Sequence, residues 1–201
     1  MLNKNNLIIK NFCAKGGIRP ELNGIFIEPK RTTATDSFIL MSVSKPKANI
    51  TDYPKVPDKP TPLENFKPFI LPATDAEIIL KTLPKKPTLP ILENAVIYKT
   101  TPEMAEIGIT DLQSNQTITP RVIQGEYPAY QDIMVERGSF TEIKVNPELL
   151  QKISKFFTQF LDKETFKGLI MKVPKEPDKP IRFYAKKDGQ TAEALLMPLK
   201  S

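Results

Sequence analysis

The plan of this chain is clearest in residues 140–161, FTEIKVNPELLQKISKFFTQFL. Residues 140–145 alternate apolar and polar side chains, which is the pattern of a β-strand with one buried face. Asn146 suits the N-cap of a helix, Pro147 its first position and Glu148 its first turn. The stretch therefore predicts a strand that leads directly into a helix.

The predicted helix has one apolar and one polar face. The apolar face carries Leu149, Leu150, Ile153, Phe156, Phe157, Phe160 and Leu161. The opposite face offers amines and amides from Gln151, Lys152, Ser154, Lys155, Thr158 and Gln159. This pattern predicts a helix that packs on a sheet. Strands are expected at Gly168–Val173, Ile181–Lys186 and Thr191–Pro198, with a turn at Lys187-Asp188-Gly189.

Two earlier segments follow the same plan, because candidate helices begin near residues 5, 75 and 147, about 70 residues apart. In the second segment a strand at Pro68–Leu71 precedes a capping box, Thr74-Asp75-Ala76-Glu77, and Pro84 ends the helix. Its later strands are expected at Glu93–Lys99, Ala105–Thr110 and Gln116–Ile123.

The first segment looks shortened at its start. Its helix, Asn5–Lys15, is expected to end at a Gly16-Gly17 C-cap, and the strand before it is missing or very short. Strands should follow at Leu22–Glu28, Arg31–Thr35 and Phe38–Ser44. The proline-rich stretch Lys45–Lys67 is predicted to be an extended surface spacer, with a proline-rich ligand for a partner as the alternative.

Composition argues against an enzyme. The chain has no histidine and a single cysteine, Cys13, so it lacks Ser-His-Asp and Cys-His catalytic sets and the usual zinc ligands. Cys13 is expected to be a small apolar helix residue, and helix capping accounts for Asp75 and Glu77. We expect no catalytic residues, metal or cofactor. Without a signal peptide or a long apolar run, the chain is expected to be cytoplasmic and free of membranes.

The net charge of +6 comes from lysine, with 24 Lys against 5 Arg. Lysine supplies a point charge without the bidentate fork of arginine, so this composition suits sequence-independent contact with a phosphate backbone. An ordinary solvated surface would have the same composition. Charge alone therefore leaves nucleic-acid binding open.

Four short motifs resemble the bacterial beta sliding clamp, the ring that tethers the replicative polymerase to DNA. They are Arg19-Pro20-Glu21-Leu22-Asn23-Gly24, Ala34-Thr35-Asp36-Ser37-Phe38-Ile39-Leu40, Gly125-Glu126-Tyr127-Pro128-Ala129-Tyr130 and Leu195-Leu196-Met197-Pro198-Leu199-Lys200. They are similar to the family's R-x-x-L-N-G, A-T-D-G-H-R-L, G-x-[FY]-P-x-Y and V-M-P-M-R-L segments, and they occur in the family's order. The resemblance covers most of the chain, the proline-rich stretch excepted.

The resemblance implies an α+β DNA-clamp-like fold, with three strand–helix–strand units, antiparallel sheets outside and helices on the inner face. Residues 1–135 resemble the middle domain of the clamp, and residues 136–201 resemble the second half of its last domain. The first domain and the first half of the last domain have no counterpart in this chain.

In the family, a groove between the middle and last domains binds partner peptides. The resemblance places sixteen residues of this chain there: Arg19, Leu22, Thr35, Ser37, Phe38, Ile39, Leu40, Pro128, Asp132, Ile133, Asn146, Leu149, Leu195, Met197, Pro198 and Leu199. As plain structural positions, the leucines could be core residues, Asn146 a helix cap and Pro128 a turn former. The chain departs from the family at Ser37-Phe38-Ile39, which replaces Gly-His-Arg, at Asp132 in place of a basic residue, and at Leu149 in place of an aromatic one.

Family helices line a DNA channel with basic residues. The corresponding lysines here are Lys4, Lys10, Lys15, Lys81, Lys152 and Lys155. The resemblance thus implies a processivity factor whose partners are polymerase subunits, a clamp loader and double-stranded DNA. The alternative is a peptide-binding adaptor, or a competitor of a full-length clamp, that does not encircle DNA. The chain is also expected to form a homo-oligomer or to associate with a partner clamp chain, and the second arrangement would supply the missing domains.

Overall fold

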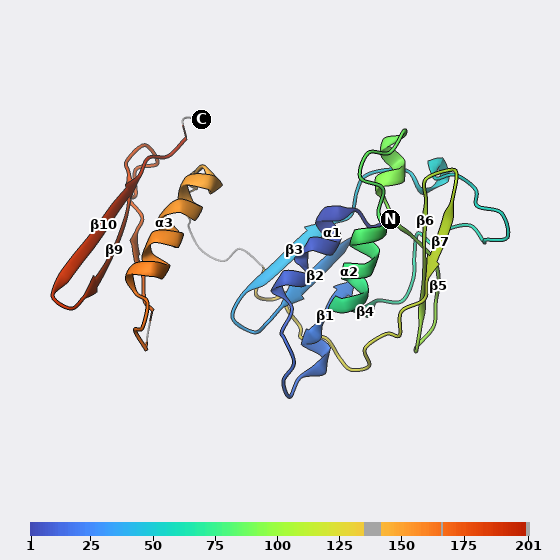
Figure 1. Cartoon of the computed structure of the whole chain (residues 1–201), viewed down its shortest axis with the longest axis horizontal. Coiled ribbons are helices and arrows are strands. Elements are labelled where there is room, and N and C mark those ends of the chain that lie inside the picture. The colour runs from blue at the N-terminus through green and yellow to red at the C-terminus, as the bar shows by residue number, and fades with distance from the viewer. Residues whose placement is uncertain (135–141, 166, 200–201) are drawn as a thin grey trace. The chain divides into compact units, whose positions relative to one another are not determined.

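The computed structural model describes residues 1–134, 142–165 and 167–199 (Figure 1). The chain forms two compact units, Met1–Tyr130 and Gln131–Ser201, which we call unit 1 and unit 2. The boundary expected between residues 135 and 136 lies outside the described residues. All strand pairs within the sheets are antiparallel, as predicted for an α+β clamp-like fold.

The first half of unit 1 contains a shorter helix than the one predicted. Its elements are α1 (Lys4–Ile8), the 3₁₀ helices η1 (Ile9–Phe12) and η2 (Pro20–Asn23), and strands β1 (Gly24–Ile27), β2 (Arg31–Thr35) and β3 (Leu40–Ser44). Asn3 caps α1 reciprocally with Asn6, and the buried Asn6 amide donates to Thr32 and Ser44. This tertiary network fixes the first turn, and the chain tightens to 3₁₀ geometry after it.

Two predictions for this half are therefore wrong. Cys13 is not helical, because it has an extended backbone just after η1. Gly16-Gly17 is not a helix C-cap, since these residues lie in a loop beyond Cys13, where both have positive φ. The strand expected before the helix is reduced to one bridge, between Leu2 and Ala95.

The second half of unit 1 begins with β4 (Phe69–Pro72), which runs directly into α2 (Ala73–Thr82). The predicted capping box is wrong, because Pro72 is the N-cap, makes no side-chain cap bond, and Thr74 already lies inside the helix. The 3₁₀ helix η4 and a three-stranded sheet follow, with bounds Pro90–Glu93 for η4, Val96–Thr100 for β5, Ala105–Thr110 for β6 and Asn115–Ile118 for β7. Strand β7 ends five residues before the predicted end at Ile123.

The two halves of unit 1 exchange their leading strands. Strand β4 belongs to the second half but pairs with β1 of the first, giving the sheet order β3-β2-β1-β4. In return, Leu2 of the first half bridges Ala95 of the second. Helices α1 and α2 pack side by side (Figure 1), and one buried core joins both halves, including Leu7, Ile25, Leu71, Ile79, Ile97 and Ile107.

The proline-rich stretch is anchored rather than a free spacer. It contains the 3₁₀ helix η3 (Ile50–Asp52), and Ile50 and Tyr53 are buried against Val96 and Tyr98 of β5. Its far end is tied to the same strand, because the Leu63 amide donates to the Ile97 carbonyl at 2.7 Å. The stretch therefore covers β5. The burial of Ile50 and Tyr53 was not predicted from the sequence.

Unit 2 agrees most closely with the sequence prediction. It consists of α3 (Pro147–Phe160) and strands β8 (Ile170–Lys172), β9 (Ile181–Lys187) and β10 (Gln190–Leu196), in the order β10-β9-β8. Asn146 caps α3 through bonds from the Glu148 and Leu149 amides. The core contains Phe157, Leu161, Ile181, Phe183, Ala185 and Leu196.

Two parts of the unit 2 prediction are wrong. The predicted strand at 140–145 is absent from its described part, residues 142–145, and residues 140–141 lie outside the described residues. Leu149 and Phe156 were expected on the buried face of α3, but they are 44% and 52% exposed. A helix on a three-stranded sheet covers a narrower face than the sequence pattern indicates.

Lys45 holds the start of the proline-rich stretch at an energetic cost. Its ammonium lies 4.2 Å from the Phe66 ring centre and has no hydrogen-bond partner among the residues that the structure describes. Burial lowers the pKa of Lys45 to about 8, with a smaller opposing effect from Glu28. Below this value the folded state carries a poorly solvated charge, which the unfolded chain hydrates freely.

We predict that Lys45→Met raises unfolding stability at pH 7 by about 1–3 kcal/mol, because the buried charge is removed while its apolar stem is replaced. Between pH 8 and 10.5 the unfolded chain binds the Lys45 proton more tightly than the folded chain does. The free energy of unfolding of the wild type therefore rises with pH in this range, and the difference between the wild type and the variant becomes smaller. Thermal melts at pH 7 and 10.5 measure both effects. The exposed Lys47→Met is the control, and equal melting shifts for the two variants would contradict the prediction.

Candidate partner-binding surfaces

The turn between β2 and β3 presents large apolar side chains on a rigid support. The Thr35 hydroxyl donates to the Ile39 carbonyl at 2.7 Å, and the Asp36 carboxylate accepts from the amides of Phe38 and Ile39 at 2.9 and 3.0 Å. These amide bonds lower the pKa of Asp36, with Ile39 contributing most. Ser37 has a φ of 80°, so the backbone turns sharply there. Phe38 is held at the tip and is 96% exposed.

The second half of unit 1 contains a structural copy of this turn. Thr110 donates to the Ser114 carbonyl, and Asp111 accepts from the amides of Gln113 and Ser114. Leu112 has a φ of 75° and corresponds to Ser37, whereas Gln113 corresponds to Phe38. The sequence signal is the shared Thr-Asp pair, which the sequence analysis did not use as a repeat. Thr35 and Asp36 are therefore explained by turn geometry, and the tip residues are free to differ.

The motif at residues 125–130 covers the sheet face that lies opposite the helices. Phe26 stacks on Tyr127 with ring centres 4.7 Å apart, and Tyr127 meets Tyr130 edge-on. Both rings are buried in a cluster with Ile70, and Leu40 packs against it. The Tyr127 hydroxyl donates to the Thr33 carbonyl, and the Tyr130 hydroxyl donates to the Glu28 carboxylate. The motif thus packs across strands β1, β2 and β4 and holds them together.

Three of the four sequence motifs meet in unit 1. Leu40 joins the Tyr127–Tyr130 cluster to the β2–β3 turn, and Gly125 lies beside the Glu21 side chain of the first motif. Gly125 has a φ of 132°, which favours glycine. The carboxylate of Glu21 also pairs with Arg19 at 2.9 Å. Segments that are about 100 residues apart in sequence therefore form one surface.

The predicted groove residues of unit 1 differ in accessibility. Arg19, Ser37, Phe38 and Ile39 are exposed, whereas Leu40 and Pro128 are half-buried. Leu22 and Thr35 are buried, at 3% and 7% exposure, and can support the surface but offer little of it to a partner. Leu22 is thus a core position, and the Thr35 hydroxyl is used within its own turn.

The predicted groove residues of unit 2 gather at the N-terminal end of α3 and along β10. Leu195, Met197 and Leu199 are exposed. The Leu199 amide donates to the Lys144 carbonyl at 2.8 Å, which ties the C-terminal segment to the chain just before α3. Exposed Leu149 lies in the first turn of that helix, Asn146 caps it, and Pro198 is half-buried. Asp132 and Ile133, at the start of unit 2, are both exposed.

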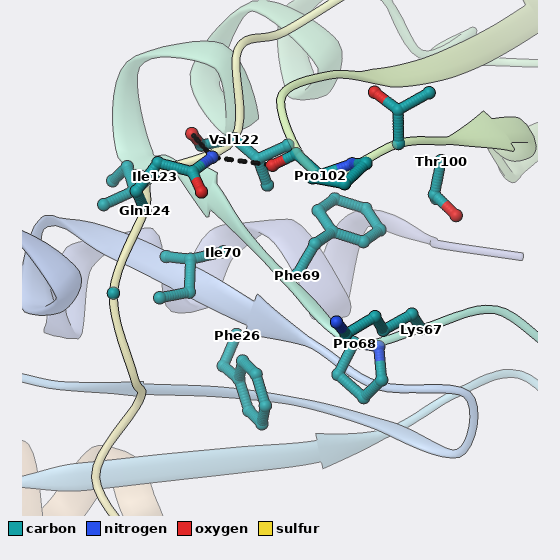
Figure 2. Close-up of a pocket in the computed structure, with 12 residues that line it drawn as sticks. Phe26, Lys67, Pro68, Phe69, Ile70, Thr100, Pro102, Val122, Ile123 and Gln124 are labelled. Carbon is teal, nitrogen blue, oxygen red and sulfur yellow. Dashed lines mark hydrogen bonds between the residues drawn. The ribbon is translucent and has the colours of Figure 1, made fainter.

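A pocket in unit 1 was not foreseen from the sequence (Figure 2). Its volume is about 260 Å³, and its lining includes Phe26, Phe69, Ile70, Pro102, Ile123 and Gln124. The Gln124 amide donates to the Pro102 carbonyl at 2.6 Å and closes one wall, as Figure 2 shows. The pocket forms because a β-bridge between Ile70 and Ile123 brings two distant segments together. No sequence motif predicts this pairing.

The predicted DNA-facing lysines fall into two groups. Lys10 and Lys81 both pair with Glu77, at 3.3 and 2.8 Å, and hydrogen bonds from Lys81 and then Lys10 lower the pKa of Glu77. Much of their charge is therefore balanced locally. The other four, Lys4, Lys15, Lys152 and Lys155, are exposed.

The described residues also bear on catalytic chemistry. Cys13 is buried, and burial raises the pKa of its thiol to about 12, so it is a poor nucleophile at neutral pH. Within residues 1–134, 142–165 and 167–199, no three His, Cys, Asp or Glu side chains gather closely enough to hold a metal ion. Across those same ranges, no helix combines the length and apolar character needed to cross a membrane.

Comparison with solved structures identifies the fold. The beta sliding clamp of C. crescentus matches 98% of this chain with a TM-score of 0.64 at 16% identity, and the sliding clamp of Pseudomonas aeruginosa matches 98% with a TM-score of 0.65 at 16% identity. The DNA polymerase III beta chain of Streptococcus pneumoniae TIGR4 matches 99% with a TM-score of 0.63 at 15% identity. No protein-family model and no curated protein matches the chain.

The chain has the DNA-clamp fold and spans about half the length of those clamps, because it covers 50%, 50% and 48% of the three structures. This agrees with the family resemblance seen in the sequence, namely to a clamp of reduced length. At 14–16% identity the match defines the fold alone. The activity and partners of the chain need separate support.

We predict that Tyr127→Ala lowers the stability of unit 1 by about 3–5 kcal/mol, because it removes a buried ring that stacks on Phe26. Tyr127→Phe keeps the ring and loses only the bond to the Thr33 carbonyl, so it should cost about 0.5–1.5 kcal/mol. Urea unfolding followed by tyrosine fluorescence and circular dichroism compares the two. Equal losses for both variants would show that the ring packing is unimportant.

Proposed function

We propose that the chain is a sliding-clamp-like processivity factor, which binds clamp-motif peptides of polymerases, the clamp loader and other replication proteins and contacts double-stranded DNA non-specifically. One observation supports this most strongly. Large apolar side chains are exposed to solvent at the groove positions implied by the family resemblance: Phe38, Ile39, Ile133, Leu149, Leu195, Met197 and Leu199. The clamp fold gives these positions a functional context.

In each unit, the exposed apolar side chains at these positions have the chemistry of a peptide anchor. Neighbouring apolar side chains that form a contiguous exposed patch mark interaction sites, and Phe38 and Ile39 are two such neighbours on one turn. Phe38 is fixed by the bonds of Thr35 and Asp36, so little ordering is required when a partner binds. Leucine, isoleucine and methionine suit the Leu and Phe side chains that clamp-motif peptides carry.

The peptide specificity should differ from that of the family. The tip Ser37-Phe38-Ile39 replaces a Gly-His-Arg turn, so an apolar contact replaces a basic one. Within unit 2, Asp132 places an acid where the family usually has a base, and Leu149 replaces an aromatic residue. We expect peptides richer in apolar residues and poorer in acidic residues to bind best.

The alternative function is a peptide-binding adaptor that does not encircle DNA. It is favoured by the pairing of Lys10 and Lys81 with Glu77, which leaves less free positive charge for contact with DNA. Retention on nicked circular DNA through a high-salt wash, with release once the DNA is cut, would support a ring. Loss of the chain in the wash, together with intact peptide binding, would support the adaptor.

We predict micromolar binding of a labelled peptide with Gln, Leu and Phe anchors, and at least a tenfold loss of affinity with Phe38→Ala or with Leu195→Glu. Fluorescence anisotropy measures both. A peptide with Leu and Phe replaced by Ala tests whether the anchors matter.

The copied turn supplies a matched control for this experiment. Leu112→Ala removes an exposed apolar side chain from the equivalent turn and should leave peptide affinity unchanged. Equal losses with Phe38→Ala and Leu112→Ala would indicate a general surface effect. No binding at hundreds of micromolar would overturn the peptide-binding proposal.

The proposed DNA contact is electrostatic and weak. Lys152 and Lys155 lie on the exposed face of α3, whereas Lys10 and Lys81 share one partner, Glu77, which offsets one of their two positive charges. Each lysine contact with a phosphate releases about one counterion, so the affinity should fall with salt only in proportion to the few contacts made, and it should show no dependence on sequence.

We predict that Glu77→Gln tightens DNA binding, because it frees Lys10 and Lys81 from their shared partner. The slope of log K against log salt should steepen by about 1–2. Lys152→Glu with Lys155→Glu should weaken binding. Titration with a fluorescent DNA duplex over a range of salt concentrations gives both slopes. An unchanged slope for Glu77→Gln would indicate that Lys10 and Lys81 do not contact DNA.

A further inference from the structure

Unit 2 corresponds to one half of unit 1. Pro72 and Asn146 are the N-caps of α2 and α3, so Ile70 and Lys144 occupy the same place, two residues before the cap. The Ile70 carbonyl accepts from the Ile123 amide at 3.0 Å, and the Lys144 carbonyl accepts from the Leu199 amide at 2.8 Å. The backbone before each helix is thus held on one edge in the same way.

The other edge differs between the two units. In unit 1, β4 also pairs along its length with β1 of the other half. Within the described residues of unit 2, segment 142–145 pairs with no strand. Strand β8 corresponds to β1 as the first strand after the helix, and it lies at the edge of its sheet, where β1 holds β4. Unit 2 therefore has a free edge on strand β8 and an unpaired segment 142–145, and their counterparts in unit 1, β1 and β4, pair with each other.

Corresponding side chains are also less buried in unit 2 than in unit 1, as expected if unit 2 lacks the packing contacts between two halves. Ile27 of β1 is fully buried and pairs with the buried Thr32. Met171 of β8 pairs with Phe183, which is buried under α3, but Met171 itself is 56% exposed. On the helix, Ala76 and Ile79 of α2 are fully buried, whereas the corresponding Leu150 and Ile153 of α3 are only half-buried.

We propose that two copies of the chain associate through unit 2, with segment 142–145 of each copy adding as a strand to β8 of the other. The halves of unit 1 already occupy each other's edges, so the matching free pair in a described part of this chain is a second unit 2. The contact is reciprocal, which makes a closed dimer rather than an open chain of copies.

Unit 1 specifies the register of the new pairing. Ile25 faces Leu71, Phe26 faces Ile70 and Ile27 faces Phe69. By correspondence, Val145 lies opposite Leu169, Lys144 opposite Ile170 and Ile143 opposite Met171 of the second copy. Ile143, Val145 and Leu169 are already half-buried against the unit 2 core, so the pairing extends that core across the two-fold axis.

The helices can meet across the same axis. In unit 1, α2 packs against α1 and η1, and its Glu77 pairs with Lys10 of η1. The corresponding residue of α3 is Gln151, the fifth residue of its helix as Glu77 is of α2. Two copies of a charged residue would repel each other on a two-fold axis, whereas two glutamines can exchange hydrogen bonds.

Solution mass tests the proposal on the full chain. Sedimentation equilibrium should give twice the chain mass of 22.7 kDa, and Met171→Glu should weaken the dimer at least tenfold, because it buries a charge opposite Ile143. Met171 is more than half exposed within one chain, so unit 2 should remain folded, which the circular dichroism of the variant checks.

Leu195→Glu is the matched control, since it charges an exposed residue of β10, the strand at the far edge of the same sheet. It should leave the mass unchanged while it weakens peptide binding, and Met171→Glu should do the reverse. The dimer and the peptide surface can therefore fail independently. A monomer at 100 µM, or a dimer equally stable in Met171→Glu, would overturn the proposal.

A disulfide cross-link tests the register. Lys144→Cys with Ile170→Cys, in a Cys13→Ala background, should form a covalent dimer on mild oxidation, since these positions face each other between copies. Lys144→Cys with Lys186→Cys places the second thiol on the central strand β9 and should remain monomeric on denaturing gels. Covalent dimer from the second pair but not the first would contradict the arrangement.

Discussion

The exchange of leading strands between half-units is the constraint on which this structure depends. A three-stranded antiparallel sheet has two unpaired strand edges, and a single helix covers only part of its apolar face. Unit 1 solves this by giving β4 to the sheet of the first half, while Leu2 bridges the second half. The core can then close over both helices, and Ile25, Leu71, Ala76 and Ile79 reach full burial. The described part of unit 2 corresponds to one such half, and its strand β8 lies at an open edge of the sheet.

The four-stranded sheet of unit 1 is apolar on both faces, so a second layer of side chains packs on the face opposite the helices. Ile25 and Ile27 of β1 point to the helices, whereas Phe26 between them points to the other side. The Tyr127–Tyr130 cluster covers that second face and brings the third motif against the first two. Motifs that resemble a binding groove therefore also hold the sheet together. Their buried members support the site from below, and the exposed tip residues are available to a partner.

Sequence reasoning predicted best where local signals agreed with burial. Helix α3 was predicted from Asn146 onward, because its cap, its Pro147 and its apolar spacing all act within one segment. The first helix was overextended because its geometry depends on buried Asn6, which bonds to strands about 26 and 38 residues away. The capping box at Thr74 failed because β4 continues directly into α2. The pocket beside Ile70 depends on strand pairing, which no local pattern encodes.

The two copies of the Thr-Asp turn separate what the fold needs from what it leaves free. Both keep the hydroxyl and carboxylate bonds, with a positive φ at Ser37 and at Leu112. They differ at the next position, where Gln113 in one copy corresponds to Phe38 in the other. Since a glutamine is compatible with the same backbone, the turn itself does not require an aromatic ring. Phe38 gains almost no burial within unit 1, so the stability of the fold gives no reason for its presence. Contact with another molecule would supply that reason, and the neighbouring exposed Ile39 would enlarge the same contact.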